Sequence, residues 1–217
     1  STDRARATDA RVGELRRKGD HVGCVDEARA ALAWMPPGTP RLDVVNEGLT
    51  CAGHLETEAR RTMEALFANE LARMVQDPGF PVLADDRSSG YQVLVEHART
   101  ARNESGARRW AELWAAFLRA EAERASSPAA RAVFHAHRVE AQLALGEPLA
   151  AVPWLEESAR DFPRDYNPPA RLARVFLAAG KLDEAEAAIR RALSLVYGPR
   201  RARLESLAAE IAQARRP

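Results

Sequence analysis

The stretch from Pro169 to Pro199, PARLARVFLAAGKLDEAEAAIRRALSLVYGP, decides the fold class of this chain. Its apolar and small residues recur every three or four positions on both sides of Gly180, which is the spacing of one face of an α-helix. They are Leu172, Ala173 and Phe176 before the glycine, and Ala185, Ile189, Ala192 and Leu193 after it. We therefore expect two helices, at 168–179 and 183–196, joined by a tight turn at Gly180.

The same helical period continues along the rest of the chain. Glycines and prolines interrupt it at short intervals, and no segment sustains the alternation of apolar and polar residues that is typical of a strand. The segments between these interruptions have the usual length of globular helices. They predict eleven helices, at about 4–18, 21–35, 40–53, 56–76, 89–103, 107–125, 128–145, 148–161, 168–179, 183–196 and 200–215. The predicted fold class is all-α.

The segment 169–199 resembles a tetratricopeptide repeat, in which small and large apolar residues alternate at fixed places around a glycine turn. Earlier segments are similar, with Gly19 and Gly146 at the corresponding turn and, more loosely, with Gly53 and Gly106. The resemblance implies a superhelical stack of about five antiparallel helix pairs, followed by a C-terminal capping helix at 200–215. It implies one repeat domain over residues 1–217.

One stretch departs from this rhythm. Residues 77–88, DPGFPVLADDRS, contain two prolines, a glycine and three aspartates between two expected helices. A loop of this length is either a long packed connection or a boundary between two sub-stacks. We favour a connection packed by Phe80, Val82 and Leu83.

Composition argues against several classes of partner. The chain has 217 residues and a formal net charge of +1, so its overall charge does not favour nucleic acid or an anionic membrane as partner. No apolar run approaches the roughly 20 residues that a membrane span requires. The sequence also contains no nucleophile elbow, phosphate loop or zinc-protease motif, so we expect neither catalysis nor an obligatory cofactor.

Two cysteines and two histidines form the most informative cluster. His21 and Cys24 begin the second expected helix, and Cys51 and His54 end the third. These helices should run antiparallel around Gly38, which brings the two sulfurs to nearly the same height. Three interpretations remain open: a Cys24–Cys51 disulfide, two free buried thiols, or a Cys₂His₂ zinc site.

The second histidine pair favours a different interpretation. His135 and His137 lie two residues apart, so on a helix they face different directions and do not chelate a metal together. We expect them on the surface or in the groove that the repeats form.

The repeat resemblance places the first helix of each pair on a concave binding face. On it we expect a mixed-charge groove formed by Asp43, Glu47, His137, Glu140, Asn167, Arg171 and Arg174. The chain lacks the basic, asparagine-rich clamp by which some repeats hold a C-terminal carboxylate. An arginine in the groove nevertheless favours an acidic peptide.

A narrower resemblance covers residues 127–217. DFPRDYNPPARL at 161–172, with VYGPR at 196–200, is similar to the C-terminal repeat region of bacterial proteins that carry a thioredoxin-like domain upstream. It implies an accessory module of an envelope thiol-redox system, and with it a Cys24–Cys51 disulfide.

The function that the sequence favours is a non-catalytic scaffold that binds a protein or peptide on a concave helical surface. The alternatives are the thiol-redox module and a zinc-dependent sensor or enzyme that uses His21, Cys24, Cys51 and His54. Cytoplasm and bacterial periplasm or envelope both fit, and an oxidised cysteine pair favours the envelope. The sequence does not determine the partner or the oligomeric state.

Overall fold

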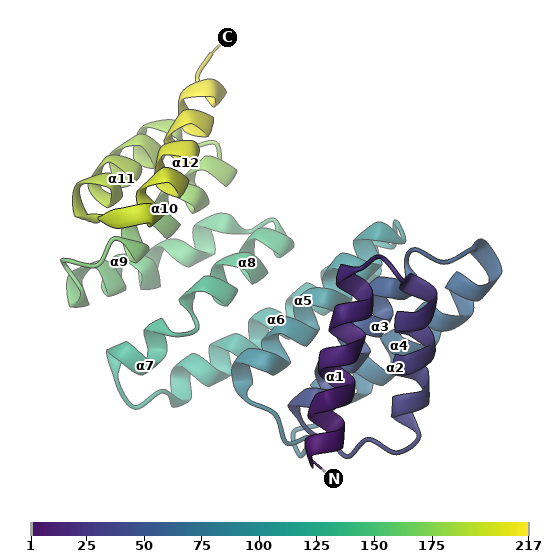
Figure 1. The fold of residues 1–217 in the computed structure, drawn as a ribbon. Helices are drawn as coiled ribbons and strands as arrows, with labels where there is room; N and C mark the ends of the chain where they lie inside the picture. Colours follow the sequence, from purple (N-terminus) through teal and green to yellow (C-terminus); the bar gives the residue numbers. More distant parts are fainter. Residues whose placement is uncertain (1, 217) are drawn as a thin grey trace. The chain divides into compact units, whose positions relative to one another are not determined.

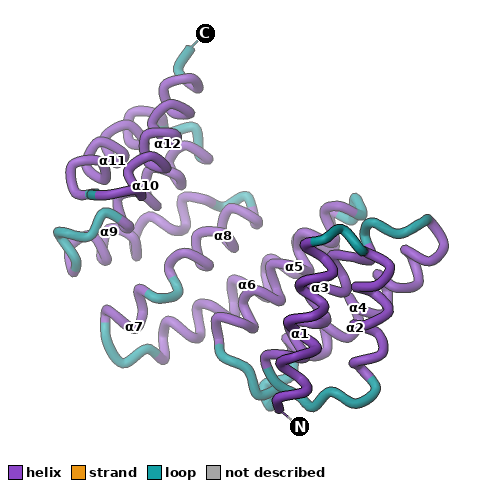
Figure 2. Tube along the Cα trace, viewed as in Figure 1, coloured by secondary structure: helices purple, strands orange, loops and turns teal. Residues whose placement is uncertain are grey.

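The computed structural model describes residues 2–216, and all regular secondary structure within that range is helical (Figures 1 and 2). The helices are α1 (Thr2–Arg17), α2 (His21–Leu32), α3 (Thr39–Ala52), α4 (Thr57–Gln76), α5 (Ala84–Thr100), α6 (Glu104–Arg124), α7 (Pro128–Ala132), α8 (His135–Leu145), α9 (Val152–Asp161), α10 (Asn167–Ala178), α11 (Leu182–Leu195) and α12 (Arg201–Ala214). Two short 3₁₀ helices, η1 (Pro148–Ala151) and η2 (Gly198–Arg200), precede α9 and α12. The all-α prediction is confirmed.

Three expected helices differ from the structure. The helix expected at 128–145 is divided into α7 and α8 by a turn at 133–134, and the one expected at 148–161 begins as the 3₁₀ helix η1. Helix α5 begins at Ala84 rather than at residue 89, so two aspartates assigned to the loop lie in its first turn. Carboxylates are favourable there because they face the positive end of the helix dipole.

Four helix pairs close with the same turn. After α1, α5, α8 and α10, one residue adopts a left-handed conformation: Gly19, Arg102, Gly146 and Gly180. In each case the next residue's N–H reaches back across the turn, as Lys181 does to the Phe176 carbonyl at 2.8 Å. This is the Schellman arrangement, which pairs carbonyls at the helix end.

The glycines expected at the two remaining turns differ from each other. Gly53 lies in the turn after α3, as expected, but with a right-handed helical φ of −60°. Gly106 lies inside α6, where its N–H donates to the Asn103 side chain at 2.9 Å, and the turn itself is made by Arg102. The placement of Gly106 at the turn was wrong because Asn103, an N-cap residue, begins the helix three positions earlier.

The chain forms two compact units, residues 1–110 and 111–217. In the first unit, α3 packs against α1, α2, α4 and α5. One close approach is at Gly48 of α3, where a Cβ atom would lie 2.7 Å from the Phe67 ring of α4. The fully buried Phe67, Leu42 and Leu71 belong to the core of this unit.

In the second unit, α10 packs against α8, α9, α11 and α12. Ile189 of α11 and Leu204 and Ile211 of α12 belong to one buried cluster, and Val139 of α8 and Leu155 of α9 belong to another. Each unit therefore has a central helix. In the first unit α3 contacts both α1 and α5, and in the second α10 contacts both α8 and α12.

The segment 77–88 lies within the first unit, its last five residues belong to α5, and the expected packing is found in part. Phe80 is buried, but Leu83 is 73% exposed and does not contribute to that packing as expected. The main anchor is Arg87, whose guanidinium is buried and donates to the carbonyls of Val75 at 2.9 Å and Phe80 at 2.8 Å. A buried arginine is tolerated here because backbone oxygens satisfy its donors.

Candidate functional site

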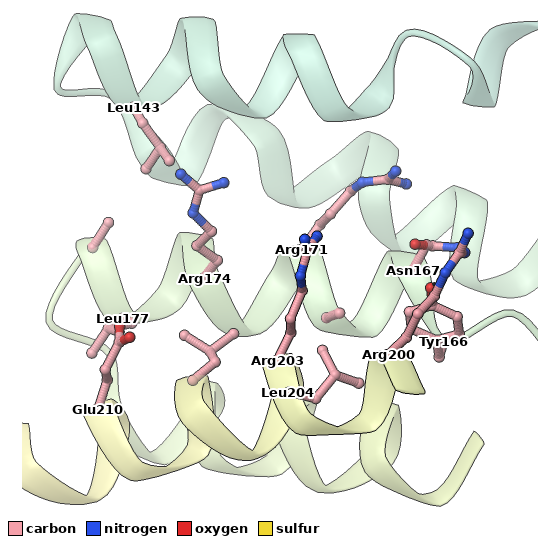
Figure 3. A pocket seen from close by; sticks show the side chains of 13 residues that line it. Leu143, Tyr166, Asn167, Arg171, Arg174, Leu177, Arg200, Arg203, Leu204 and Glu210 are labelled. Carbon is pink, nitrogen blue, oxygen red and sulfur yellow. The ribbon is translucent and has the colours of Figure 1, made fainter. Parts of the chain in front are cut away.

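The second unit contains a cavity of about 750 Å³ next to α8, α10 and α12 (Figure 3). We call it the arginine groove. It is lined by Leu143, Tyr166, Asn167, Ala170, Arg171, Arg174, Leu177, Ala178, Arg200, Arg203, Leu204, Leu207 and Glu210. Its size is in the range of pockets that hold small ligands or the side chains of a bound peptide.

Helical spacing explains how α10 forms this surface. Asn167, Arg171 and Arg174 are four and then three positions apart, so they share one face of the helix. Ala173 and Val175 point to other faces and are buried. From α12, Arg203 and Glu210 are seven positions apart and flank two leucines that line the same cavity. The groove therefore combines guanidinium groups with an apolar lining.

The arginines of the groove differ in how they are paired. Arg174 extends toward α8 (Figure 3) and forms a bidentate ion pair with Glu140, with Nη2 2.9 Å from Oε2. Arg200 donates to the hydroxyl of Tyr166 at 3.0 Å. For Arg171 and Arg203, no ion pair or hydrogen bond of the side chain is found within residues 2–216.

Arg171 also differs from the other arginines of the groove in that burial lowers the pKa of its side chain. Burial lowers the pKa of its guanidinium, and the nearby Asp165 opposes that effect. An arginine remains protonated at neutral pH even so. Arg171 is therefore a desolvated positive charge without a salt-bridge partner in the described chain, and an incoming anion would interact with it more strongly than with a fully hydrated arginine.

Three of the residues expected in a groove line this cavity: Asn167, Arg171 and Arg174. Glu140 reaches it through its ion pair with Arg174. His137 instead packs edge-on against Trp114 of α6, with ring centroids 6.4 Å apart. The sequence did not indicate Arg200 and Arg203, because they follow the last recognisable repeat.

The other two expected groove residues, Asp43 and Glu47, lie in the first unit, on α3. Burial, and then the nearby Asp9, Asp86 and Glu47, raise the pKa of Asp43 to about 6. Glu47 forms an ion pair with Arg16 of α1, and Asp86 accepts a hydrogen bond from Thr39 at 2.8 Å. This acidic surface contrasts with the arginine groove of the second unit.

The cysteine cluster resolves into a disulfide. Cys24 and Cys51 are bonded, fully buried, and have Cα atoms 6.3 Å apart. Beside them the rings of His21 and His54 are stacked, with centroids 4.1 Å apart. The two cysteines therefore lie at the same height on α2 and α3, as the antiparallel arrangement required, and the two histidines form a second pair. In this oxidised state, no group of three or more His, Cys, Asp or Glu residues between 2 and 216 is arranged to hold a metal.

The expectation that His135 lies on the surface or in the groove was wrong. It is 2% exposed, and the centroid of its ring lies 5.0 Å from that of Trp154. Within residues 2–216, neither of its ring nitrogens has a hydrogen-bond partner. Burial, followed by the charges of Arg138, Arg171 and Arg131, lowers its pKa to about 4. A signal was available, because His135, Val139 and Leu143 follow one another at intervals of four on the apolar face of α8.

Comparison with known proteins does not assign the chain to a family. A scan against models of protein families finds no match, and a search of curated proteins finds no significant similarity. Within residues 2–216, no helix combines the length and the apolar character that crossing a membrane would require.

Proposed function

We propose that this chain is a non-catalytic protein-interaction module of the tetratricopeptide-repeat type, and that its arginine groove binds an acidic segment of a partner protein. The observation that carries the proposal is the pair Arg171 and Arg203, which line one cavity without a salt-bridge partner in residues 2–216. Guanidinium groups form bidentate, charge-assisted hydrogen bonds with carboxylates, and two of them suit a segment with more than one acidic side chain.

The lining of the groove specifies the partner further. Leu143, Leu177, Leu204 and Leu207 offer apolar surface beside the charges. A purely acidic polymer would leave that surface in contact with water, whereas a peptide that alternates acidic and apolar side chains would cover both. We therefore propose a partner segment in which Asp or Glu residues flank a Leu, Ile or Phe.

Helix packing within each unit supports the repeat assignment. Helices α1, α3 and α5 contact in series in the first unit, and α8, α10 and α12 do so in the second. Tetratricopeptide repeats stack their first helices in this order, and the closing turns at Gly19, Gly146 and Gly180 fall where the resemblance requires glycine. We propose on this basis that the helix pairs form a superhelical stack, with α12 as its cap.

The experiment is a selection from a random peptide library with the wild-type chain and the double variant Arg171→Glu/Arg203→Glu. Wild type should enrich acidic–apolar sequences, and the double variant should not. Charge-assisted hydrogen bonds contribute about 1.5 kcal/mol at the low end, which is roughly tenfold in Kd for each arginine. Fluorescence anisotropy of the selected peptide measures this change directly.

Arg191→Glu is the matched control, because Arg191 is exposed on α11 outside the groove. It should bind the selected peptide like wild type at physiological ionic strength. Enrichment of basic peptides by wild type, or equal Kd values for the double variant and wild type, would refute the proposed site.

The disulfide supports a second, contextual proposal. Disulfides persist in oxidising compartments, so Cys24–Cys51 favours a bacterial periplasm or envelope and agrees with a module of a thiol-redox protein. Recovery of a thioredoxin-like protein by crosslinking in the envelope would support this context. A chain with two free thiols when isolated from its own cells would contradict it.

A further inference from the structure

The disulfide and the stacked histidines form one cluster made of two equivalent halves. His21 and Cys24 lie three residues apart at the start of α2. Cys51 lies near the end of α3, and His54 lies in the turn that follows, where its N–H donates to the Cys51 carbonyl at 3.0 Å. Residues at this spacing are neighbours on one face of a helix. Facing helices of four-helix bundles use the same spacing to present two metal ligands each.

The structure brings both halves together at the level of single atoms and rings. The Cα atoms of Cys24 and Cys51 are 6.3 Å apart, and the ring centroids of His21 and His54 are 4.1 Å apart. On a tetrahedral zinc ion, two sulfurs lie about 3.8 Å apart and two imidazole nitrogens about 3.3 Å apart, given the usual bond lengths. Each pair by itself is therefore close enough for side-chain rotation to bring its two ligand atoms to these separations.

One polar atom of the cluster has no partner in the oxidised state. The Nδ1 atom of His21 is buried, and no hydrogen bond to it is found within residues 2–216. Buried polar atoms in native proteins are usually paired, so an unpaired one at this place needs an explanation. The adjacent His54 is exposed, so one of the four side chains is in contact with solvent.

We propose that in the reduced chain His21, Cys24, Cys51 and His54 bind one zinc ion. Thiolates and neutral imidazoles are the ligands of structural zinc, and Cys₂His₂ is a common set. On binding, the two thiols lose their protons to water, and the sulfurs and two ring nitrogens each donate an electron pair to the ion. The disulfide sulfurs cannot do this, so zinc and disulfide exclude each other.

The two states share a structural consequence, because each links α2 to α3. In an oxidising compartment the disulfide makes this link, and in a reducing one zinc does. The site therefore joins the first helix pair to the second under either condition. A two-electron oxidant, such as a protein disulfide or a peroxide, takes two electrons from the zinc-bound thiolates, forms the Cys24–Cys51 bond and releases the metal.

The test uses the untagged chain, reduced with a phosphine under anaerobic conditions and titrated with Co²⁺ and then with Zn²⁺. We expect one Co²⁺ per chain, with a sulfur-to-cobalt charge-transfer band and tetrahedral d–d bands that Zn²⁺ abolishes. The oxidised chain should show neither. Absence of the charge-transfer band in the reduced wild type, or its presence unchanged in the oxidised chain, would overturn the proposal.

The variant His21→Ala/His54→Ala identifies the nitrogen ligands. We expect Co²⁺ affinity to fall at least a hundredfold, with loss of the tetrahedral spectrum, whereas His97→Ala, a histidine of α5 outside the cluster, should behave like wild type. The oxidised double variant should keep the helical circular dichroism spectrum, which separates lost ligands from a lost fold. An unchanged cobalt spectrum in the double variant would mean that the histidines are not ligands and would refute the site.

Discussion

Reduction of the Cys24–Cys51 disulfide should destabilise the first unit by about 3.5 kcal/mol. The bond closes a loop with a sequence separation of 27 residues. In the chain-entropy treatment, closing a loop of that length removes about 12 cal/mol/K from the unfolded state, which is about 3.5 kcal/mol at 25 °C. Comparison of reduced and oxidised wild type changes no side chain, so no cavity contributes to the difference.

The assay is urea unfolding followed by circular dichroism, with and without a phosphine reductant. A chelator must be present in both samples, because zinc bound to the reduced chain would restore part of the lost stability. The intact mass after alkylation of the denatured, unreduced protein provides the control, and no alkyl group should add. A stability difference below about 1 kcal/mol, or uptake of two alkyl groups without reductant, would refute the reasoning.

Three further predictions concern the fold itself. Burial lowers the pKa of His135 in the folded chain to about 4, against an ordinary value of 6.5. Its contribution to stability is therefore complete above pH 6.5 and is lost as the pH falls toward 4, by up to about 3 kcal/mol. Urea unfolding of His135→Phe should lack this loss. The pKa of Asp43 is raised to about 6, so its protonation adds stability as the pH falls and opposes the effect of His135. The loss of stability between pH 6.5 and 4 should therefore be steeper in Asp43→Asn. Gly48→Ala should lower the free energy of unfolding by about 1–3 kcal/mol, because its Cβ would lie 2.7 Å from the Phe67 ring, and an unchanged melting temperature would contradict this. Arg102→Gly should raise the melting temperature, because it relieves about 1 kcal/mol of strain in a left-handed backbone conformation. Gly180→Ala introduces the same strain at another turn and should lower the melting temperature.

Local features of the sequence were sufficient for the helices and for most of the turns. The period of apolar residues around Leu172 and Ile189 depends only on the geometry of a single helix, and a glycine with positive φ, such as Gly180, terminates it by a local rule. Where a different residue made the turn, as Arg102 does, the prediction misplaced it. Propensity disfavours arginine in that conformation, and the hydrogen bonds of the turn override it.

The candidate site was only partly predictable for a related reason. Asn167, Arg171 and Arg174 lie on one helix face, so their common direction follows from spacing within α10. Arg203 comes from α12, outside the last recognisable repeat, and its position opposite Arg171 depends on how two helices pack. Whether an arginine has an ion-pair partner also depends on that packing. Glu140 of α8 pairs with Arg174, whereas no ion pair of Arg171 is found within residues 2–216.

Taken by itself, the sequence determined that this chain is helical, where its breaks fall, and that Cys24 and Cys51 come to the same height on neighbouring helices. Each of these follows from distances of a few residues along the chain, over which helical geometry is nearly invariant. Only the tertiary structure decided that His135 is buried, that Arg87 anchors the 77–88 connection, and that four arginines from α10, η2 and α12 line one cavity. Burial and ion pairing depend on which surfaces are in contact. Those contacts join residues far apart in the chain, so the helical period of apolar residues does not predict them.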